Sequence, residues 1–296
     1  MPCIRLDKND AVDAAAISRR MRSIRPGEAV GRPSMRFVPV RSIDNQAQLM
    51  RHRARELLAG NRTRMLNALR GHLQANAEHS SVAEIGVVAA QGAQHAYELK
   101  RLLVDGADEN GEVVVPDCVR QALAPLVRQI DAIDGELAAI DDEIKALVKA
   151  DDTARRLMTI PGIGPITASA IVATVQDMGA FASGREFAAF LGLTPRQNAS
   201  GGKERLGRIT PAKPSVLLEM GDRYLRKLLV VGACATLSHR KGHHDALRVW
   251  ADQLLARKEV RYKFKLAAVA LANKVARIVF VLMTRGGEYN ETPVAA

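Results

Sequence analysis

The sequence predicts a mainly α-helical protein, and three segments carry that prediction. Residues 45–75 combine many arginines with an apolar side, as one long helix would. Residues 264–283 are largely apolar but interrupted by charged and amide side chains, which predicts a core helix with a solvated stripe and not a membrane anchor. Between positions 116 and 150, apolar residues alternate at spacings of three and four, which is a heptad seam: Leu123, Leu126, Ile130, Ile133, Leu137, Ile140, Ile144 and Leu147.

Composition adds to this expectation. The chain has 296 residues with ordinary globular content, 47% hydrophobic and 25% charged. No stretch of about 18 uncharged apolar residues is present, and the first residues carry charges where a secretory signal needs an apolar core. The three cysteines are far apart in the sequence and suit a reducing compartment. We therefore expect a cytoplasmic protein without a membrane partner.

The charge falls in three blocks. Residues 1–100 carry a net charge of +7, residues 101–152 of −8 and residues 153–296 of +12. Basic blocks of this size indicate a polyanionic partner, most plausibly nucleic acid, because neutralised phosphates supply affinity whatever the base sequence. On the helix predicted over 45–75, the candidate phosphate ligands are Arg51, Arg53, Arg55, Arg62, Arg64 and Arg70. The alternative is a merely solvated arginine face.

The heptad seam needs a partner helix, because alone it would leave its apolar side in water. We favour self-association of residues 117–150 as a coiled coil, which predicts a homo-oligomer. The alternative is packing against another helix of the same chain.

Residues 157–171 predict a helix–hairpin–helix that holds a phosphate backbone. Gly162 and Gly164 permit a tight turn and a close backbone approach, and the next helix offers its N–H groups near Thr167. Pro165 suits the first turn of that helix because it has no N–H to leave unpaired. The alternative is an ordinary corner between two helices.

Farther along, Ser200 is flanked by small residues, and cations surround it in the sequence: Arg196, Lys203, Arg205 and Arg208. A serine hydroxyl attacks phosphorus only where charge on the phosphate oxygens is stabilised, and these cations meet that need. Spacing alone leaves two interpretations open, a nucleophile and a flexible phosphate-binding loop.

Several strings together resemble the transposases of the insertion sequence 110/1111 family. They are Ile-Pro-Gly-Ile-Gly at 160–164, Phe-Leu-Gly-Leu-Thr-Pro at 190–195, Ser-Gly-Gly-Lys at 200–203, Gly-Asp-Arg-Tyr-Leu-Arg at 221–226 and Lys-Asn-Asp at 8–10. The resemblance covers nearly the whole chain. It implies a partial RuvC-like domain, of ribonuclease-H type, with the basic helix at 1–100, and a helical C-terminal transposase domain with the hairpin at 153–296. The heptad seam makes residues 101–152 the coiled-coil linker between them.

The resemblance also implies a mechanism. Such proteins are recombinases with an Asp-Glu-Asp-Asp set expected to bind Mg²⁺, and a C-terminal serine is the covalent nucleophile on DNA. They act as multimers and take a guide RNA transcribed from the element's flank. By position, Asp10 and Asp13 match the last two acids and Ser200 matches the nucleophile. Carboxylates three residues apart can share a hard cation, although Asp10 in isolation would suit a helix cap.

The sequence departs from the family pattern in two places. It lacks the segment that would carry the first Asp and the Glu, and an additional stretch at 211–219 separates Arg208 from Asp222. The expected function is thus a DNA transposase that cleaves and rejoins strands, in a form made inactive if those acids are lost. The alternative is a non-catalytic nucleic-acid-binding protein left from a decayed element.

Overall fold

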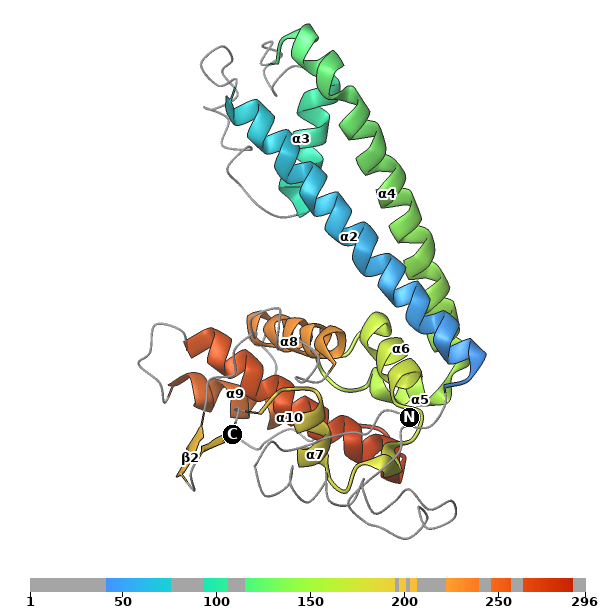
Figure 1. Ribbon diagram of the computed structural model, residues 1–296, viewed down its shortest axis with the longest axis vertical. Coiled ribbons are helices and arrows are strands. Elements are labelled where there is room, and N and C mark those ends of the chain that lie inside the picture. The colour runs from blue at the N-terminus through green and yellow to red at the C-terminus, as the bar shows by residue number, and fades with distance from the viewer. Residues whose placement is uncertain are drawn as a thin grey trace. The chain divides into compact units, whose positions relative to one another are not determined.

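The computed structural model describes residues 41–75, 93–105, 115–194, 197–200, 203–206, 222–239, 246–256 and 263–289. Most of them are helical, so the prediction of a mainly α protein is confirmed. The chain divides into two compact units (Figure 1). The helical unit is Met50–Glu143, and the C-terminal unit combines Ile144–Ala296 with Met1–Leu49. The predicted domain boundaries at residues 100 and 152, and the RuvC-like region, stay predictions.

The helical unit is built from helices α2 (Ile43–Ala75), α3 (Ala93–Asp105) and α4 (Asp117–Ala150), of which α2 and α4 continue into the other unit. Both long helices lie where the sequence predicts them. α2 runs without a break through Gly60. α4 begins directly after Pro116, and proline suits the start of a helix because it has no N–H group to leave unpaired.

One apolar core joins α2, α3 and α4. Its buried members come from all three helices and from Val115, which lies just before α4: Leu66, Leu69, Leu73, Leu99, Leu103, Val115, Leu123, Val127 and Ile130. The first half of the predicted seam is therefore covered within the chain, which is the alternative that the sequence left open. In the second half Ile144 is also buried, whereas Ile133, Leu137 and Ile140 are half-buried and Leu147 is exposed.

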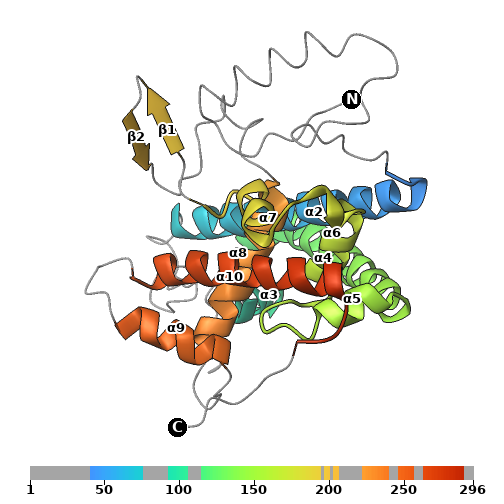
Figure 2. The ribbon, with the colours of Figure 1, turned by 90° about the horizontal axis from the view of Figure 1, so that it is seen from below.

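The C-terminal unit is organised around helix α10 (Lys263–Arg285), which contacts α5 (Asp152–Leu157), α7 (Gly184–Phe190), α8 (Arg223–Ser238), α9 (Ala246–Ala256) and the short 3-10 helix η4 (Met178–Ala180). Helix α6 (Pro165–Thr174) contacts α5 and α8. Two short strands, β1 (Gln197–Ser200) and β2 (Lys203–Leu206), form an antiparallel ribbon that extends away from the helices (Figure 2).

Helix α10 is long and apolar enough to cross a membrane by length and composition, and among the described residues it is the one helix that is. Its apolar side is used inside the protein, since it is buried at Ala268, Leu271, Ala272, Ala276 and Val279, each at most 1% exposed. These residues recur at helical spacing on the face that meets α7 and α8. The predicted core helix with a solvated stripe is confirmed.

Candidate functional site

The helices on both sides of the α5–α6 turn have defined starts, and a glycine forms the turn between them. Asp151 caps α5, its Oδ1 accepting the N–H groups of Thr153 at 2.7 Å and Ala154 at 3.1 Å. Gly162 then reverses the chain at φ +88°, a left-handed conformation that other residues rarely adopt, and Pro165 opens α6. The two helices and the glycine turn lie where the sequence predicts them.

Gly162 is also fixed by contact with α8. A Cβ atom on Gly162 would lie 2.6 Å from Thr236 Oγ1, and one on Gly232 would lie 2.0 Å from the carbonyl oxygen of Gly162. The two backbones therefore touch, which only glycine permits at both positions. Gly162 can be predicted from its motif in the sequence, whereas Gly232 cannot, because its one visible signal is a small residue four positions before Thr236 on an apolar helix.

Gly164 lies in a different environment. Its φ is −94°, it serves as the N-cap of α6 without a side-chain hydrogen bond, and a Cβ there would meet no atom within 4 Å. The space beside Gly164 is thus open, and the helix starts there without a capping side chain. Thr167, by contrast, is buried at 6% exposure.

The segment around Ser200 is a two-stranded ribbon and not a loop. Ser200 pairs with Lys203, and Asn198 pairs with Arg205. Paired residues share a face of a ribbon, and so do residues two apart on one strand. Register therefore places Ser200, Lys203, Asn198 and Arg205 on one face, with Ala199 and Glu204 on the other. Of the four predicted cations, two share the face of Ser200.

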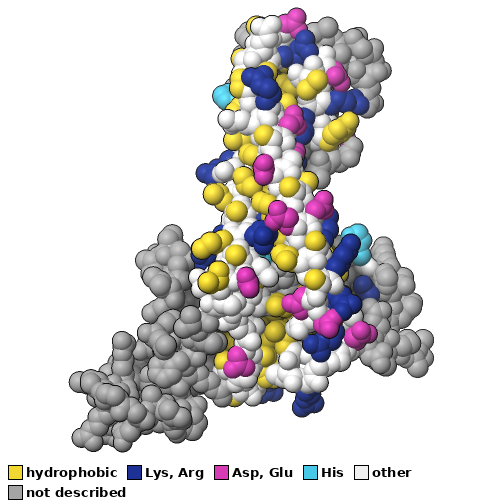
Figure 3. Space-filling view, turned by 90° about the vertical axis from the view of Figure 1, so that its right-hand side faces the viewer, with side chains coloured by type: hydrophobic (Ala, Val, Ile, Leu, Met, Phe, Trp, Pro, Cys, Tyr) yellow, Lys and Arg dark blue, Asp and Glu magenta, His cyan; other side chains and the backbone are white. Residues whose placement is uncertain are grey.

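The arginines of α2 have partners that the sequence did not reveal. Arg51 Nε lies 2.7 Å from Glu143 Oε2, Arg55 Nε lies 2.5 Å from Asp141 Oδ1, and Arg62 Nε donates to Asp134 Oδ1. The acidic face of α4 thus neutralises three of the six candidate phosphate ligands. Along the helical unit, both signs of charge alternate with apolar side chains (Figure 3).

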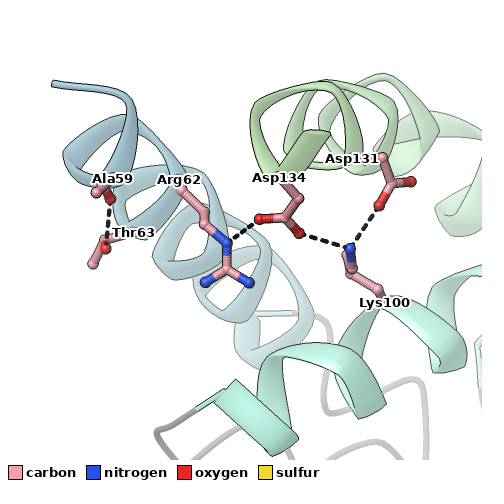
Figure 4. Close-up of polar contacts among 6 residues, drawn as sticks. All are labelled: Ala59, Arg62, Thr63, Lys100, Asp131 and Asp134. Carbon is pink, nitrogen blue, oxygen red and sulfur yellow. Dashed lines mark hydrogen bonds and ion pairs between the residues drawn. The ribbon is translucent and has the colours of Figure 1, made fainter. Parts of the chain in front are cut away.

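Asp134 lies at the centre of this network (Figure 4). Lys100 of α3 donates to Asp134 Oδ2 at 3.0 Å and to Asp131 Oδ1 at 2.6 Å. Burial opposes the charge of Asp134, but the hydrogen bonds from Arg62 and Lys100 outweigh it and lower its pKa. Burial likewise opposes the charge of Lys100, and the two aspartates raise its pKa instead. The network links all three helices.

The other three α2 arginines differ in exposure and in the charge of the groups that they contact. Arg53 and Arg64 are exposed, and Arg70 is half-buried. Arg64 and Arg70 donate to the amide oxygens of Asn61 and Asn67 one turn earlier, which are neutral acceptors. Their positive charge is therefore not cancelled by these contacts, in contrast to that of Arg51, Arg55 and Arg62.

Several predicted residues lie outside the described residues: Asp10, Asp13, Arg196, Arg208 and the stretch 211–219. Within the described ranges, no group of three or more His, Cys, Asp or Glu side chains is placed to hold a metal ion. The predicted Mg²⁺ site at Asp10 and Asp13 stays a prediction.

Comparison with known proteins gives a consistent result. Residues 154–248 match the transposase IS116/IS110/IS902 family. A putative transposase of Sinorhizobium fredii is 38% identical over 98% of this chain and 66% of its own length. A probable family 20 transposase of Pseudomonas aeruginosa is 36% identical over 96% of this chain and 74% of its own length.

A third relative, the transposase for insertion sequence element IS1111A of Coxiella burnetii, is 34% identical over 97% of this chain and 70% of its own length. The match thus extends through the helical unit as well as the C-terminal unit. The chain belongs to the IS110 family of insertion-sequence transposases.

Proposed function

We propose that this chain is a DNA transposase in which Ser200 is the nucleophile that cleaves and rejoins strands. The Ser200 hydroxyl gives up its proton as its oxygen attacks a phosphodiester phosphorus, a serine–phosphate bond forms, the bond from phosphorus to the sugar oxygen breaks, and that departing oxygen takes up a proton. Attack by a sugar hydroxyl on the serine–phosphate bond reverses these changes and rejoins DNA. Asp10 and Asp13 take part as ligands of Mg²⁺.

The pairing of Ser200 with Lys203 is the observation that carries this proposal. Cross-strand neighbours have Cβ atoms about 5 Å apart, so an ammonium group on the same face can reach a phosphate attacked by the serine. Arg205, paired with Asn198, adds a second cation to that face. Two cationic residues on the face of Ser200 would supply stabilisation for charge that grows on the phosphate oxygens in the transition state.

The turn between α5 and α6 holds the DNA backbone in this proposal, as a helix–hairpin–helix. The open space beside Gly164 and the uncapped start of α6 support a backbone contact, because a phosphate can approach N–H groups there without meeting a side chain. Such a contact reads no base sequence. Among the arginines of α2, Arg53, Arg64 and Arg70 are the better candidates for further phosphates.

The family resemblance supports three other parts of the proposal. A guide RNA from the element's flank selects the DNA, two carboxylates supply the oxygen ligands that Mg²⁺ prefers, and bound Mg²⁺ would neutralise phosphate charge and lower the pKa of the attacking hydroxyl. The protein acts in the cytoplasm as a homo-oligomer through 117–150, for which the half-buried Ile133, Leu137 and Ile140 offer a remaining seam.

The test incubates the purified chain with DNA of its element, the flank RNA and Mg²⁺. We expect a protein–DNA adduct that withstands denaturation and is lost in Ser200→Ala. Ser238→Ala, at the exposed end of α8, is the matched control and should retain the adduct. DNA binding should survive both changes and fall steeply with salt. Salt-sensitive binding without any adduct would indicate a non-catalytic nucleic-acid-binding protein.

A further inference from the structure

The segment Leu191–Thr194, which leads from α7 to the Ser200 ribbon, is held first by its own helix. Gly192 N–H donates to Ala189 O at 2.9 Å and Leu193 N–H donates to Ala188 O at 3.0 Å. With Gly192 at φ +69°, these two bonds form a Schellman motif, the arrangement that ends many helices at a glycine. The N–H groups of Gly192 and Leu193 thus bond to α7, and the carbonyl oxygens of these two residues accept from other helices.

Two side chains from helices far along the sequence donate to the carbonyl oxygens of this segment. Asn273 of α10 donates its Nδ2 to Leu193 O at 3.2 Å, and Arg226 of α8 places its Nη1 3.5 Å from Gly192 O. The donors lie 80 and 34 residues away along the sequence. The segment is therefore bonded to three helices at once, α7 through its N–H groups and α8 and α10 through its carbonyls.

The anchored segment is also held by burial of its leucines. Leu191 is fully buried and Leu193 is 2% exposed, so the two leucines fix the segment in the core between the polar contacts. Asn273 interrupts the apolar surface of α10 beside the buried Ala272. An amide half-buried there would be destabilising without a hydrogen-bond partner, and Leu193 O supplies one.

Arg226 is also partly desolvated. Burial, with the neighbouring charge of Arg223, lowers the pKa of its guanidinium, and Asp222 opposes that change. An interior acceptor such as Gly192 O is a fitting partner for a guanidinium N–H group in this position.

We propose that Asn273, assisted by Arg226, is a positioning residue for Ser200. An isolated two-stranded ribbon is marginally stable, so its placement depends on what holds its ends. Gln197 follows Leu193 by four residues, which span at most about 14 Å when extended. The anchor at Leu193 therefore limits where the ribbon, and with it Ser200, can lie. This proposal rests on the proposed role of Ser200.

The experiment compares the full chain with Asn273→Ala, Asn273→Asp, Arg226→Met and Arg226→Lys. Hydrogen exchange measured by mass spectrometry follows peptides from 191–206, from α8 and from α10. Adduct formation is followed at saturating element DNA, with flank RNA and Mg²⁺, and the Kd for DNA is measured separately. Lys265→Gln, an exposed change on the same helix, is the control.

We expect exchange in 191–206 to rise at least about tenfold in the Asn273 variants while α8 and α10 keep their protection. Adduct formation should slow by about 10- to 100-fold with the Kd for DNA within about twofold, because misplacement of a reacting group affects the rate and not the binding. Arg226→Met should show smaller changes of the same kind, and Arg226→Lys should restore part of them.

Unchanged exchange in 191–206 would overturn the anchor, and unchanged adduct formation in both Asn273 variants would overturn the positioning role. A general loss of protection in α8 and α10 would also contradict the proposal, since it would show that Asn273 stabilises the whole unit. If the unaltered chain forms no adduct, the proposed nucleophile fails and the positioning role falls with it, whereas the exchange comparison still decides whether Asn273 anchors the ribbon.

Discussion

The two units of the molecule use different contacts to hold their helices together. In the helical unit, large aliphatic side chains fill the core and long charged side chains join α2 to α4 across it, as Arg62 joins Asp134. In the C-terminal unit, small residues let backbones meet directly, as Gly162 meets Gly232. The first kind of contact tolerates adjustment because long side chains move, whereas backbone contact does not.

The largest expected effect is in the C-terminal unit. Gly232→Ala would place a Cβ 2.0 Å from the carbonyl oxygen of Gly162, so α8 or the glycine turn must shift. We expect a loss of about 3 kcal/mol or more in the free energy of unfolding, measured by urea denaturation.

The control for that change is Val231→Ala, at the neighbouring and 59% exposed position of α8, which should alter stability by less than about 0.5 kcal/mol. Equal effects of the two substitutions would show that the close contact between Gly162 and Gly232 is not limiting.

The second prediction concerns His52, a titratable side chain buried in the helical unit at 1% exposure. Burial, followed by the charges of Arg55 and Arg51, lowers its pKa to about 4. The unfolded chain, with a pKa near 6.5, binds more protons between those values, so stability is complete above about pH 6.5 and falls as the pH drops toward 4. The full loss is at most about 3 kcal/mol.

The measurement is urea denaturation of the full chain and of His52→Gln from pH 7 to pH 4, in which the unfolding of the helical unit is monitored. The variant removes this titration, so the difference in stability between the two proteins should change with pH across that range. A constant difference would mean that His52 is not held neutral in the folded protein.

The sequence predicts the elements that periodicity controls and misses those that depend on partners far along the chain. Helices α2, α4 and α10 follow from arginine and apolar spacing, and the Gly162 turn follows from its glycines. The ribbon was predicted as a loop, because residues 197–206 are polar and lack the apolar alternation of a half-buried strand.

The pairing of charges was missed for a related reason. Arginines of α2 and carboxylates of α4 are both plain in the sequence, but only the fold brings Arg51 to Glu143 and Arg62 to Asp134, 92 and 72 residues apart. Resemblance and composition single out Ser200, Gly162 and Gly164, whose roles toward DNA stay predictions. The backbone contact of Gly232 and the hydrogen bond of Asn273 cannot be predicted in this way, since they exist only where α8 and α10 reach another segment.

The third prediction tests how much the ion pairs of the helical unit contribute. Asp134→Asn removes the charge that both Arg62 and Lys100 contact. Because the Asp134 side chain is 32% exposed, solvent screens the pairs, and we expect a loss of only about 1 kcal/mol. Urea denaturation at low and high salt measures it, and about 1 M salt should reduce the loss.

Asp131→Asn is the matched control, because Asp131 is 57% exposed and, in the part of the chain that the structure describes, forms an ion pair with Lys100 and no other residue. It should have the smaller effect. A loss for Asp134→Asn well above 3 kcal/mol would indicate that the helical unit depends on charge pairing as strictly as the C-terminal unit depends on its glycines.

The smallest expected effect is a gain, and it contrasts the same substitution in both units. Gly135 lies exposed within α4, and a Cβ there would meet no atom within 4 Å. Gly135→Ala should therefore raise the unfolding free energy by about 0.5–1 kcal/mol, because alanine favours the helix and restricts the unfolded chain. Gly162→Ala, at φ +88° and against Gly232, should instead destabilise. Thermal denaturation of the two variants should give shifts of opposite sign, and shifts of one sign would contradict the distinction between Gly135, which has room on an exposed helix face, and Gly162, whose backbone meets Gly232.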